Sequence, residues 1–344
     1  MRPPSLPISK KKDISLNTAA FSKARGRLEQ GLIDQAFIAS TDYSNLNCVQ
    51  RWYGRLVYNT DGTYFQMQDT PDVSEQYRVN KNADGTLQGY PQGLLQVITQ
   101  HGTGLISNYR ISGRDRSELD VLCEMLDDMP EHSLLLADDL YNCYSMFSLL
   151  LERHIDMIVP DKKGRPYRVI KQISPGDEIV EILKPHHKIR PLVPTQTFLS
   201  KITLRRISYR DPEHPEETRA ILTTVFDDSI ERHEIIHKFH TRWDVEVTIR
   251  EIKTIMGINI ARSKSEDMVF KEMGVALLAY NLVRKIIAQS AEKASFPPET
   301  DIFQELYSTY SPPLVDRKGR VYSRWSPGRP PNNHNKTERQ SYSH

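Results

Sequence analysis

The sequence predicts an α/β protein, and three observations lead to this prediction. Three strand-like segments come first, separated by turn residues in the manner of antiparallel strands, at 55–60, 94–99 and 105–112. Helical and apolar strand-like segments then alternate, at 115–126, 133–137, 142–153 and 155–159. From Ser229 to about Ala291 the apolar residues recur at helical spacing, with an interruption near Gly257.

The first element is a predicted basic helix over 16–39, within a short arm and linker that we place at 1–45. Asn17 or Thr18 can cap it, and apolar residues follow at helical spacing. Its positive charge comes from Lys23, Arg25 and Arg27. Residues 1–13 are rich in Pro and Lys without periodicity, which predicts disorder.

Residues 46–160 hold the strands and helices described above, and we predict that they form the first part of the core. The segment 133–137 is wholly apolar, as expected of a strand buried on both faces, and it ends at Asp138. Residues 161–228 alternate Pro, Gly and charge with Thr, Val, Ile and Tyr, which predicts a β-rich insertion.

Residues 229–310 are predicted to form a helical second part of the core. The remaining segment, 311–344, is basic and rich in Pro and Asn, so it cannot bury a core and is predicted to be mostly disordered. It is either an inert solvated tail or a segment that contacts phosphates.

Composition excludes some classes of protein. The 344 residues are 38% hydrophobic, and no run approaches the ~20 apolar residues of a membrane-spanning helix. Three scattered cysteines give neither a disulfide framework nor a cysteine zinc site, so we expect a reducing, cytoplasmic compartment. The 46 basic and 44 acidic residues leave a net charge of +2, which neither supports nor excludes nucleic acid.

The segment 239–253 carries the strongest chemical signal. On one helix, an apolar stripe forms from Val245, Ile249, Ile252 and Met256. An adjoining face collects Arg242, Glu246, Arg250 and Lys253, whereas Glu251 falls far from both faces. Salt bridges between residues four apart on a solvated helix explain this pattern, and so does a metal ligand flanked by cations that bind phosphate.

Two further carboxylates strengthen the second interpretation. Asp61 follows a predicted strand and begins Asp61-Gly62-Thr63, and Asp138 ends the apolar strand. Taken singly, each is more often a turn residue or a helix cap, yet strand ends are where α/β sheets place their sites. Together with Glu246 they could hold two Mg²⁺ ions ~4 Å apart for phosphoryl transfer.

The spacing of Phe239, Arg242, Glu246 and Lys253 matches Tyr-x2-Arg-x3-Glu-x6-Lys, with Phe in place of Tyr. This is the signature of DDE transposases of the insertion-sequence-four class, which the chain resembles over most of 17–290. Asp138-Asp139-Leu140-Tyr141 resembles the Asp-x-Gly-Tyr of that class, with Leu in place of Gly. The spacing to Tyr141 favours Asp138 over Asp139 as the catalytic carboxylate.

The resemblance implies a ribonuclease-H-like catalytic domain, with the β-rich insertion between the second Asp and the Glu. It implies Mg²⁺-dependent cleavage and strand transfer at transposon ends, with two ions for which Mn²⁺ can substitute. The implied partners are double-stranded DNA, both transposon ends and target, and a second copy of the chain, in a prokaryotic, nucleoid-associated setting. The implied catalytic and metal-binding residues are Asp61, Asp138 and Glu246, and the predicted DNA contacts are Phe239, Arg242, Arg250, Lys253, Lys23, Arg25 and Arg27.

Two alternatives remain open at the level of sequence. His233, Glu234 and His237 match H-E-x-x-H, the pattern of a zinc metallohydrolase, although that site needs a third ligand. The other alternative is an inactive DNA-binding relic of a transposase, since fold does not secure function. Relatives begin with a longer helical region that binds the ends, so we expect weak preference for the element's own ends here.

Overall fold

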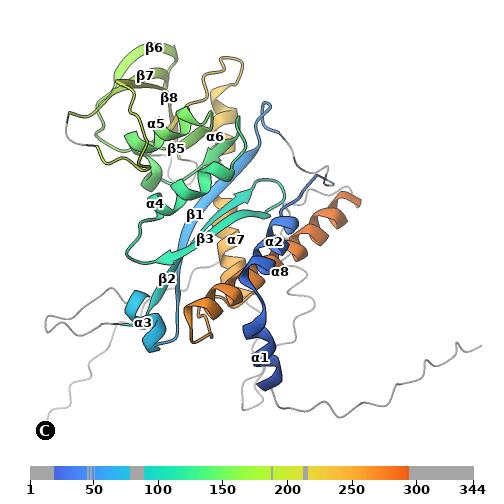
Figure 1. The fold of residues 1–344 in the computed structure, drawn as a ribbon. Coiled ribbons are helices and arrows are strands. Elements are labelled where there is room, and N and C mark those ends of the chain that lie inside the picture. The colour runs from blue at the N-terminus through green and yellow to red at the C-terminus, as the bar shows by residue number, and fades with distance from the viewer. Residues whose placement is uncertain are drawn as a thin grey trace, which may run out of the picture. The chain divides into compact units, whose positions relative to one another are not determined.

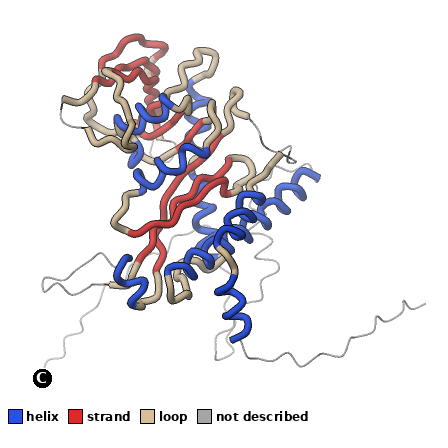
Figure 2. The backbone as a smooth tube through the Cα atoms, viewed as in Figure 1, coloured by secondary structure: helices blue, strands red, loops and turns tan. Residues whose placement is uncertain are grey.

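A nine-stranded sheet organises the described residues, with strand order β3-β2-β1-β4-β5-β9-β8-β7-β6 (Figures 1 and 2). The computed structural model describes residues 19–44, 46, 49, 51–77, 89–186, 189–211 and 216–293. The predicted disordered segments 1–13 and 311–344 lie outside these ranges. The strands are β1 (Val57–Gln66), β2 (Gln92–Gln100), β3 (Ile106–Gly113), β4 (Leu134–Leu136), β5 (Asp156–Pro160), β6 (Arg168–Ser174), β7 (Asp177–Leu183), β8 (Lys201–Arg210) and β9 (Thr218–Thr223).

The helices confirm the predicted mixture of α and β elements. They are α1 (Ala19–Arg27), α2 (Gln30–Ser40), α3 (Pro71–Tyr77), α4 (Glu118–Met125), α5 (Tyr144–Glu152), α6 (Arg232–His240), α7 (Trp243–Thr254) and α8 (Glu266–Lys293). Two short 3₁₀ turns are η1 (Leu126–Asp128) and η2 (Asp139–Tyr141). No helix among the described residues is long and apolar enough to cross a membrane.

The register around β1 decides where the polar side chains lie. β1 pairs antiparallel with β2, with Asp61 opposite Val97, and parallel with β4, where Asn59 is opposite Leu136. The pairing with β4 stops there, so the rest of β1 extends beyond the carboxyl end of β4. Continuing the register by two residues brings Asp138 level with Asp61.

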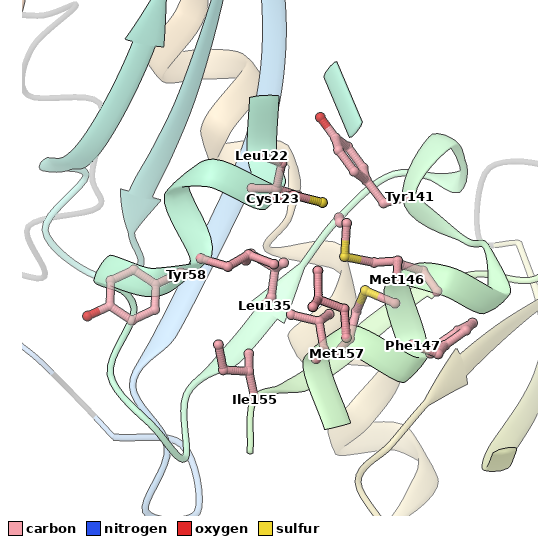
Figure 3. Close-up of a cluster of buried hydrophobic side chains, with 14 of the residues drawn as sticks. Tyr58, Leu122, Cys123, Leu135, Tyr141, Met146, Phe147, Ile155 and Met157 are labelled. Atoms are coloured by element: carbon pink, nitrogen blue, oxygen red, sulfur yellow. The ribbon is translucent and has the colours of Figure 1, made fainter. Parts of the chain in front are cut away.

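Helices cover both faces of the sheet (Figure 1). One face packs against α4 and α5 in a cluster that includes Tyr58 of β1 and Tyr141 (Figure 3). Phe65 of β1 belongs to the other face, in a cluster with residues of α7 and α8. Because successive side chains of a strand point to opposite faces, Asp61 shares the face of Phe65, and Gly62 shares the face of Tyr58.

The β-rich character predicted for 161–228 is confirmed, since β6 to β9 lie within it. These strands continue the same sheet, because β9 pairs with β5 and with β8. A buried ion pair joins two strands of this segment, β7 and β8. Arg205 of β8 binds the Asp177 carboxylate through Nε at 2.9 Å and Nη2 at 2.7 Å, and both side chains are 2% exposed. The predicted domain boundaries themselves remain predictions.

Three details of the predicted elements are wrong. The single helix over 16–39 is two helices, because Glu29 is extended (φ −73°, ψ 137°) and starts α2 as its N-cap residue. β1 does not end before Asp61, because antiparallel pairing with β2 continues through Gln66. The helix over 239–253 breaks between α6 and α7, where Thr241 is the C-cap residue of α6 and Arg242 is the N-cap residue of α7.

Candidate active site

Asp61 lies in the middle of β1, on the face covered by α7. The backbone N–H of Gly62 donates to Asp61 Oδ1 at 2.9 Å. Burial raises the pKa of Asp61 to about 6, with smaller contributions from the nearby carboxylates of Glu118 and Glu246. The Gly62 N–H and the Arg242 guanidinium act in the opposite direction. The carboxyl group therefore sits in a partly desolvated, negatively charged environment.

Asp138 follows β4, where the apolar strand ends. It is the N-cap residue of η2, and its Oδ1 accepts a hydrogen bond from the backbone N–H of Asp139 at 2.7 Å. The side chain is half-buried, whereas that of Asp139 is exposed. The cap explains the position of Asp138 structurally, and it uses one of the two carboxylate oxygens.

Glu246 lies in the first turns of α7, whose buried side packs on β1. Val245 and Ile252 are buried on that side, as the predicted apolar stripe requires. Glu246 Oε1 lies 2.9 Å from Arg242 Nη1, an ion pair between residues four apart. The Arg242 side chain is 10% exposed, and its guanidinium also stacks 5.3 Å from the exposed ring of Trp243. The salt-bridge interpretation of this helix is thus confirmed for one pair.

The other two cations of α7 differ in their surroundings. Lys253 is half-buried and close enough to Asp61 for that carboxylate to raise its pKa, although burial lowers the pKa more. Arg250 is exposed. Glu251 lies apart from these cations, on the side of α7 that faces α8. Glu251 is 3% exposed and accepts a hydrogen bond from Tyr280 of α8 at 2.9 Å, because α8 covers the remaining side of α7.

The fold therefore brings Asp61, Asp138 and Glu246 to one region from three separate elements. The carboxylates of Glu246 and Glu118 both raise the pKa of Asp61. Asp138 in turn raises the pKa of Glu118. Carboxylate oxygens are the hard donors that Mg²⁺ prefers, so the donor chemistry fits a divalent cation. Among the described residues, however, no three His, Cys, Asp or Glu side chains are grouped to hold a metal ion. A ligand set shared by all three carboxylates would therefore require their side chains to move.

Comparison with known proteins places the chain in a family. A family model described as the transposase DDE domain matches residues 52–282. The chain belongs to this family. It is 25% identical over 280 residues to the transposase InsG for insertion sequence element IS4 of Escherichia coli strain K12, and the alignment covers 80% of this chain. The chain thus spans 62% of the length of that relative.

A piggyBac transposase, solved as a synaptic complex with hairpin DNA, is a structural neighbour. The superposition has a TM-score of 0.36 and 8% sequence identity, and it covers 79% of this chain and 62% of that chain. The resemblance to DDE transposases of the insertion-sequence-four class is confirmed by the family match and the IS4 relative together.

The predicted DNA contacts of this transposase domain fall into different environments. Phe239 is 7% exposed and packs in a core cluster with Ile235, so its ring contributes to the hydrophobic core. The residues of α1 are exposed, but Arg25 Nη2 donates to Ser263 Oγ at 3.2 Å and ties α1 to the segment before α8. Lys23 and Arg27 are exposed cations.

A pocket of about 700 Å³ adjoins Asp138 on the side of the β-rich segment. Asp138 and Arg242 line it together with Trp243, and so do Lys162 and Lys163, which follow β5. β4 and β5 are parallel neighbours, so the residues after their carboxyl ends meet at one edge of the sheet. The pocket combines two exposed lysines and an exposed aromatic ring, a composition suited to phosphates and bases.

The H-E-x-x-H pattern serves a structural purpose in α6. The side chain of Glu234 accepts from the backbone N–H of Glu231 at 3.1 Å in a capping box, and its other oxygen accepts from Tyr53 Oη at 2.6 Å. His233 Nδ1 lies 3.0 Å from the Glu231 carboxylate. Both carboxylate oxygens of Glu234 thus accept hydrogen bonds that stabilise the start of α6. The zinc metallohydrolase alternative has no support in this arrangement.

Sequence reasoning missed one carboxylate of this region, Glu118 at the start of α4. Burial raises its pKa, the hydrogen bond from Tyr141 lowers it, and Asp138 raises it. An acidic residue in the first turn of a helix is an ordinary stabilising feature, so no signal in the sequence distinguishes Glu118 from other such residues. Only the packing of α4 against β1 places it beside Asp61.

Proposed function

We propose that this chain is the catalytic part of a DNA transposase that hydrolyses phosphodiester bonds and transfers strands at transposon ends. The observation that carries the proposal is the meeting of Asp61 and Glu246, from β1 and α7, beside the chain that leaves β4 at Asp138. Family membership and the Arg242, Glu246 and Lys253 spacing support it. The three antiparallel strands followed by two parallel strand–helix units are consistent with a ribonuclease-H-like core.

Asp61, Asp138 and Glu246 would hold the divalent cations, with Mg²⁺ as the proposed ion and Mn²⁺ as its substitute. When bound, such ions stabilise the attacking and leaving oxygens of an in-line displacement at phosphorus. The chain's own residues then have separate tasks. Lys253, beside Asp61, presents an ammonium group to a phosphate oxygen. Arg242 holds Glu246 until the ligand set closes, and its released guanidinium can then bind a second phosphate oxygen.

Double-stranded DNA is the proposed substrate, both as transposon end and as target, and we propose a homodimer on DNA. Lys162 and Lys163 extend the cationic surface from α7 across the pocket beside Asp138. Such residues bind phosphates and position the duplex without reading its sequence. Arg250, Lys23 and Arg27 are proposed as further phosphate contacts, because all three are exposed cations.

The test uses the full chain with duplexes taken from the DNA that flanks its reading frame. Wild-type protein should nick these duplexes with Mg²⁺ or Mn²⁺, and Asp61→Asn should retain binding but lose cleavage by several orders of magnitude. The reason is that metal stabilisation is worth several kcal/mol, at about 1.4 kcal/mol per tenfold in rate. Binding without metal-dependent cleavage by the wild type would support an inactive relic instead.

A further inference from the structure

Glu118 of α4 lies directly against the backbone of β1 at Gly62, the residue next to Asp61. A Cβ added to Gly62 would be 2.5 Å from the carboxyl carbon of Glu118 and 2.6 Å from its Oε2. Only glycine leaves room for this approach, because any side chain at that position would displace the carboxylate. The contact places Glu118 on the α4 face of β1, while Asp61 occupies the α7 face.

A hydrogen-bond chain fixes the Glu118 carboxylate. Tyr141 Oη donates to Glu118 Oε2 at 3.3 Å and accepts from Gln96 Nε2 at 2.8 Å. Gln96 Nε2 also donates to Thr60 Oγ1 at 2.9 Å. Tyr141 is fully buried and belongs to η2, the turn that Asp138 caps. Glu118 is therefore tied both to the central strands and to the turn that carries Asp138.

The orientation of the Gln96 amide follows from its partners. Thr60 Oγ1 donates its proton to the Val97 carbonyl at 3.0 Å, and Tyr141 Oη donates its proton to Glu118. Both hydroxyl groups can therefore only accept from Gln96, which must present its Nε2 to them. The amide oxygen is left on the opposite side, facing Gly62.

The surroundings of Gln96 Oε1 indicate a ligand. Gln96 is fully buried, and Oε1 has no hydrogen-bond partner within the part of the chain that the structure describes. It lies 2.7 Å from the same Cβ position at Gly62 that Glu118 Oε2 approaches at 2.6 Å. Two oxygen acceptors thus converge on one point, and a buried acceptor without a donor is unfavourable. A cation or a water molecule bound between Gln96 Oε1 and Glu118 Oε2 would give both oxygens a partner.

We propose that Glu118 and Gln96 form a further part of the divalent-cation site, on the α4 side of Asp61. Glu118 supplies an oxygen ligand, directly or through a bound water, and Gln96 Oε1 accepts a hydrogen bond from cation-bound water. Mg²⁺ retains several waters in proteins and uses few direct ligands, so outer oxygens of this kind suit it. Tyr141 is a positioning residue that orients Glu118. The inference rests on the proposed function, since it extends the same metal site.

The experiment measures equilibrium Mn²⁺ binding to the full chain without DNA, by electron paramagnetic resonance of the free ion. Glu118→Gln should weaken Mn²⁺ binding about tenfold, within the range found when outer partners of metal ligands are removed. Glu152→Gln is the matched control, because Glu152 is exposed at the end of α5 and its loss changes the net charge equally. The control should change the affinity less than twofold.

Two conservative variants keep the inference testable if Glu118→Gln does not fold. Glu118→Asp retains the charge but shortens its reach, and Tyr141→Phe removes only the orienting hydroxyl. Each should weaken Mn²⁺ binding by about threefold, below the effect of losing an outer partner entirely. Unchanged affinity in both variants would overturn the role of Glu118.

Asp61→Asn separates this inference from the proposed function. If Asp61→Asn abolishes Mn²⁺ binding while Glu118→Gln matches the Glu152→Gln control, only the role of Glu118 is refuted. If Asp61→Asn leaves binding intact, the proposed metal site itself fails. In cleavage assays Glu118→Gln should raise the Mg²⁺ concentration at half-maximal rate about tenfold while the maximal rate changes less, as expected of an outer ligand.

Discussion

Asp61→Asn should make the metal-free protein more stable at neutral pH, although it removes a proposed catalytic group. Burial and the neighbouring carboxylates raise the pKa of Asp61 from 3.8 to about 6. At about 1.4 kcal/mol per pH unit, ionising this carboxyl at neutral pH lowers the free energy of unfolding by about 3 kcal/mol at most. Because the site is partly hydrated, we expect a gain of roughly 1–3 kcal/mol from the neutral amide.

The pH dependence gives the prediction its sign. Below pH 3.8 the carboxyl is protonated in both states and has no effect on stability. Between pH 3.8 and about 6 the folded state binds the proton more tightly, so the free energy of unfolding falls as the pH rises. Above pH 6 the loss is complete. The advantage of Asp61→Asn should therefore be about a third of its full size at pH 4.5 and complete at pH 7.5.

Urea unfolding with EDTA present, at both pH values, measures this difference. Asp139→Asn is the control, since Asp139 is an exposed carboxylate next to Asp138 in the chain. It should change the free energy of unfolding by less than about 0.5 kcal/mol. If Asp61→Asn is less stable than wild type at pH 7.5, the carboxylate is not in a desolvated, negatively charged environment, and the arrangement of the site is wrong.

Three more predictions concern separate parts of the chain. Arg205→Met should lower the free energy of unfolding by about 3–5 kcal/mol in urea, because it leaves a buried carboxylate unpaired; a change below 1 kcal/mol would contradict the buried pair. Glu246→Gln should abolish cleavage, whereas Glu251→Gln, which faces α8, should destabilise the fold but leave the cleavage chemistry nearly intact; equal loss in folded samples of both would refute the site. Replacing Lys162 and Lys163 by Ala should reduce the salt slope of DNA binding by about 2, at about 0.9 per phosphate contact; an unchanged slope would remove the pocket from the DNA surface.

Local patterns were sufficient for most of the elements. The apolar run 133–137 predicted β4, and the alternation of Pro, Gly and charge with Thr, Val, Ile and Tyr predicted the β-rich character of 161–228, because both patterns depend on neighbours in sequence. The break between α6 and α7 was not predictable in this way. No Gly or Pro marks it, and the helical periodicity of 239–253 continues through Thr241.

The sequence by itself determined the family, through the spacing of Arg242, Glu246 and Lys253 on one helical face. Residues within about three turns of one helix keep their relative positions in any fold, so such a motif can be recognised without a structure. The sequence could not determine that Glu251, on another side of the same helix, is buried against α8. That depends on which helix packs on the far side of α7.

Only the tertiary structure decided which groups surround Asp61. The approach of Glu118 requires a glycine at position 62, a particular register of β1 with β2, and the packing of α4 across them. None of these is local, since the contacts join residues distant in sequence and their geometry follows from sheet pairing and helix packing. The motifs in the sequence could therefore indicate Asp61, Asp138 and Glu246. The position of Glu118 is evident only in the folded chain, where it lies against Gly62 of β1.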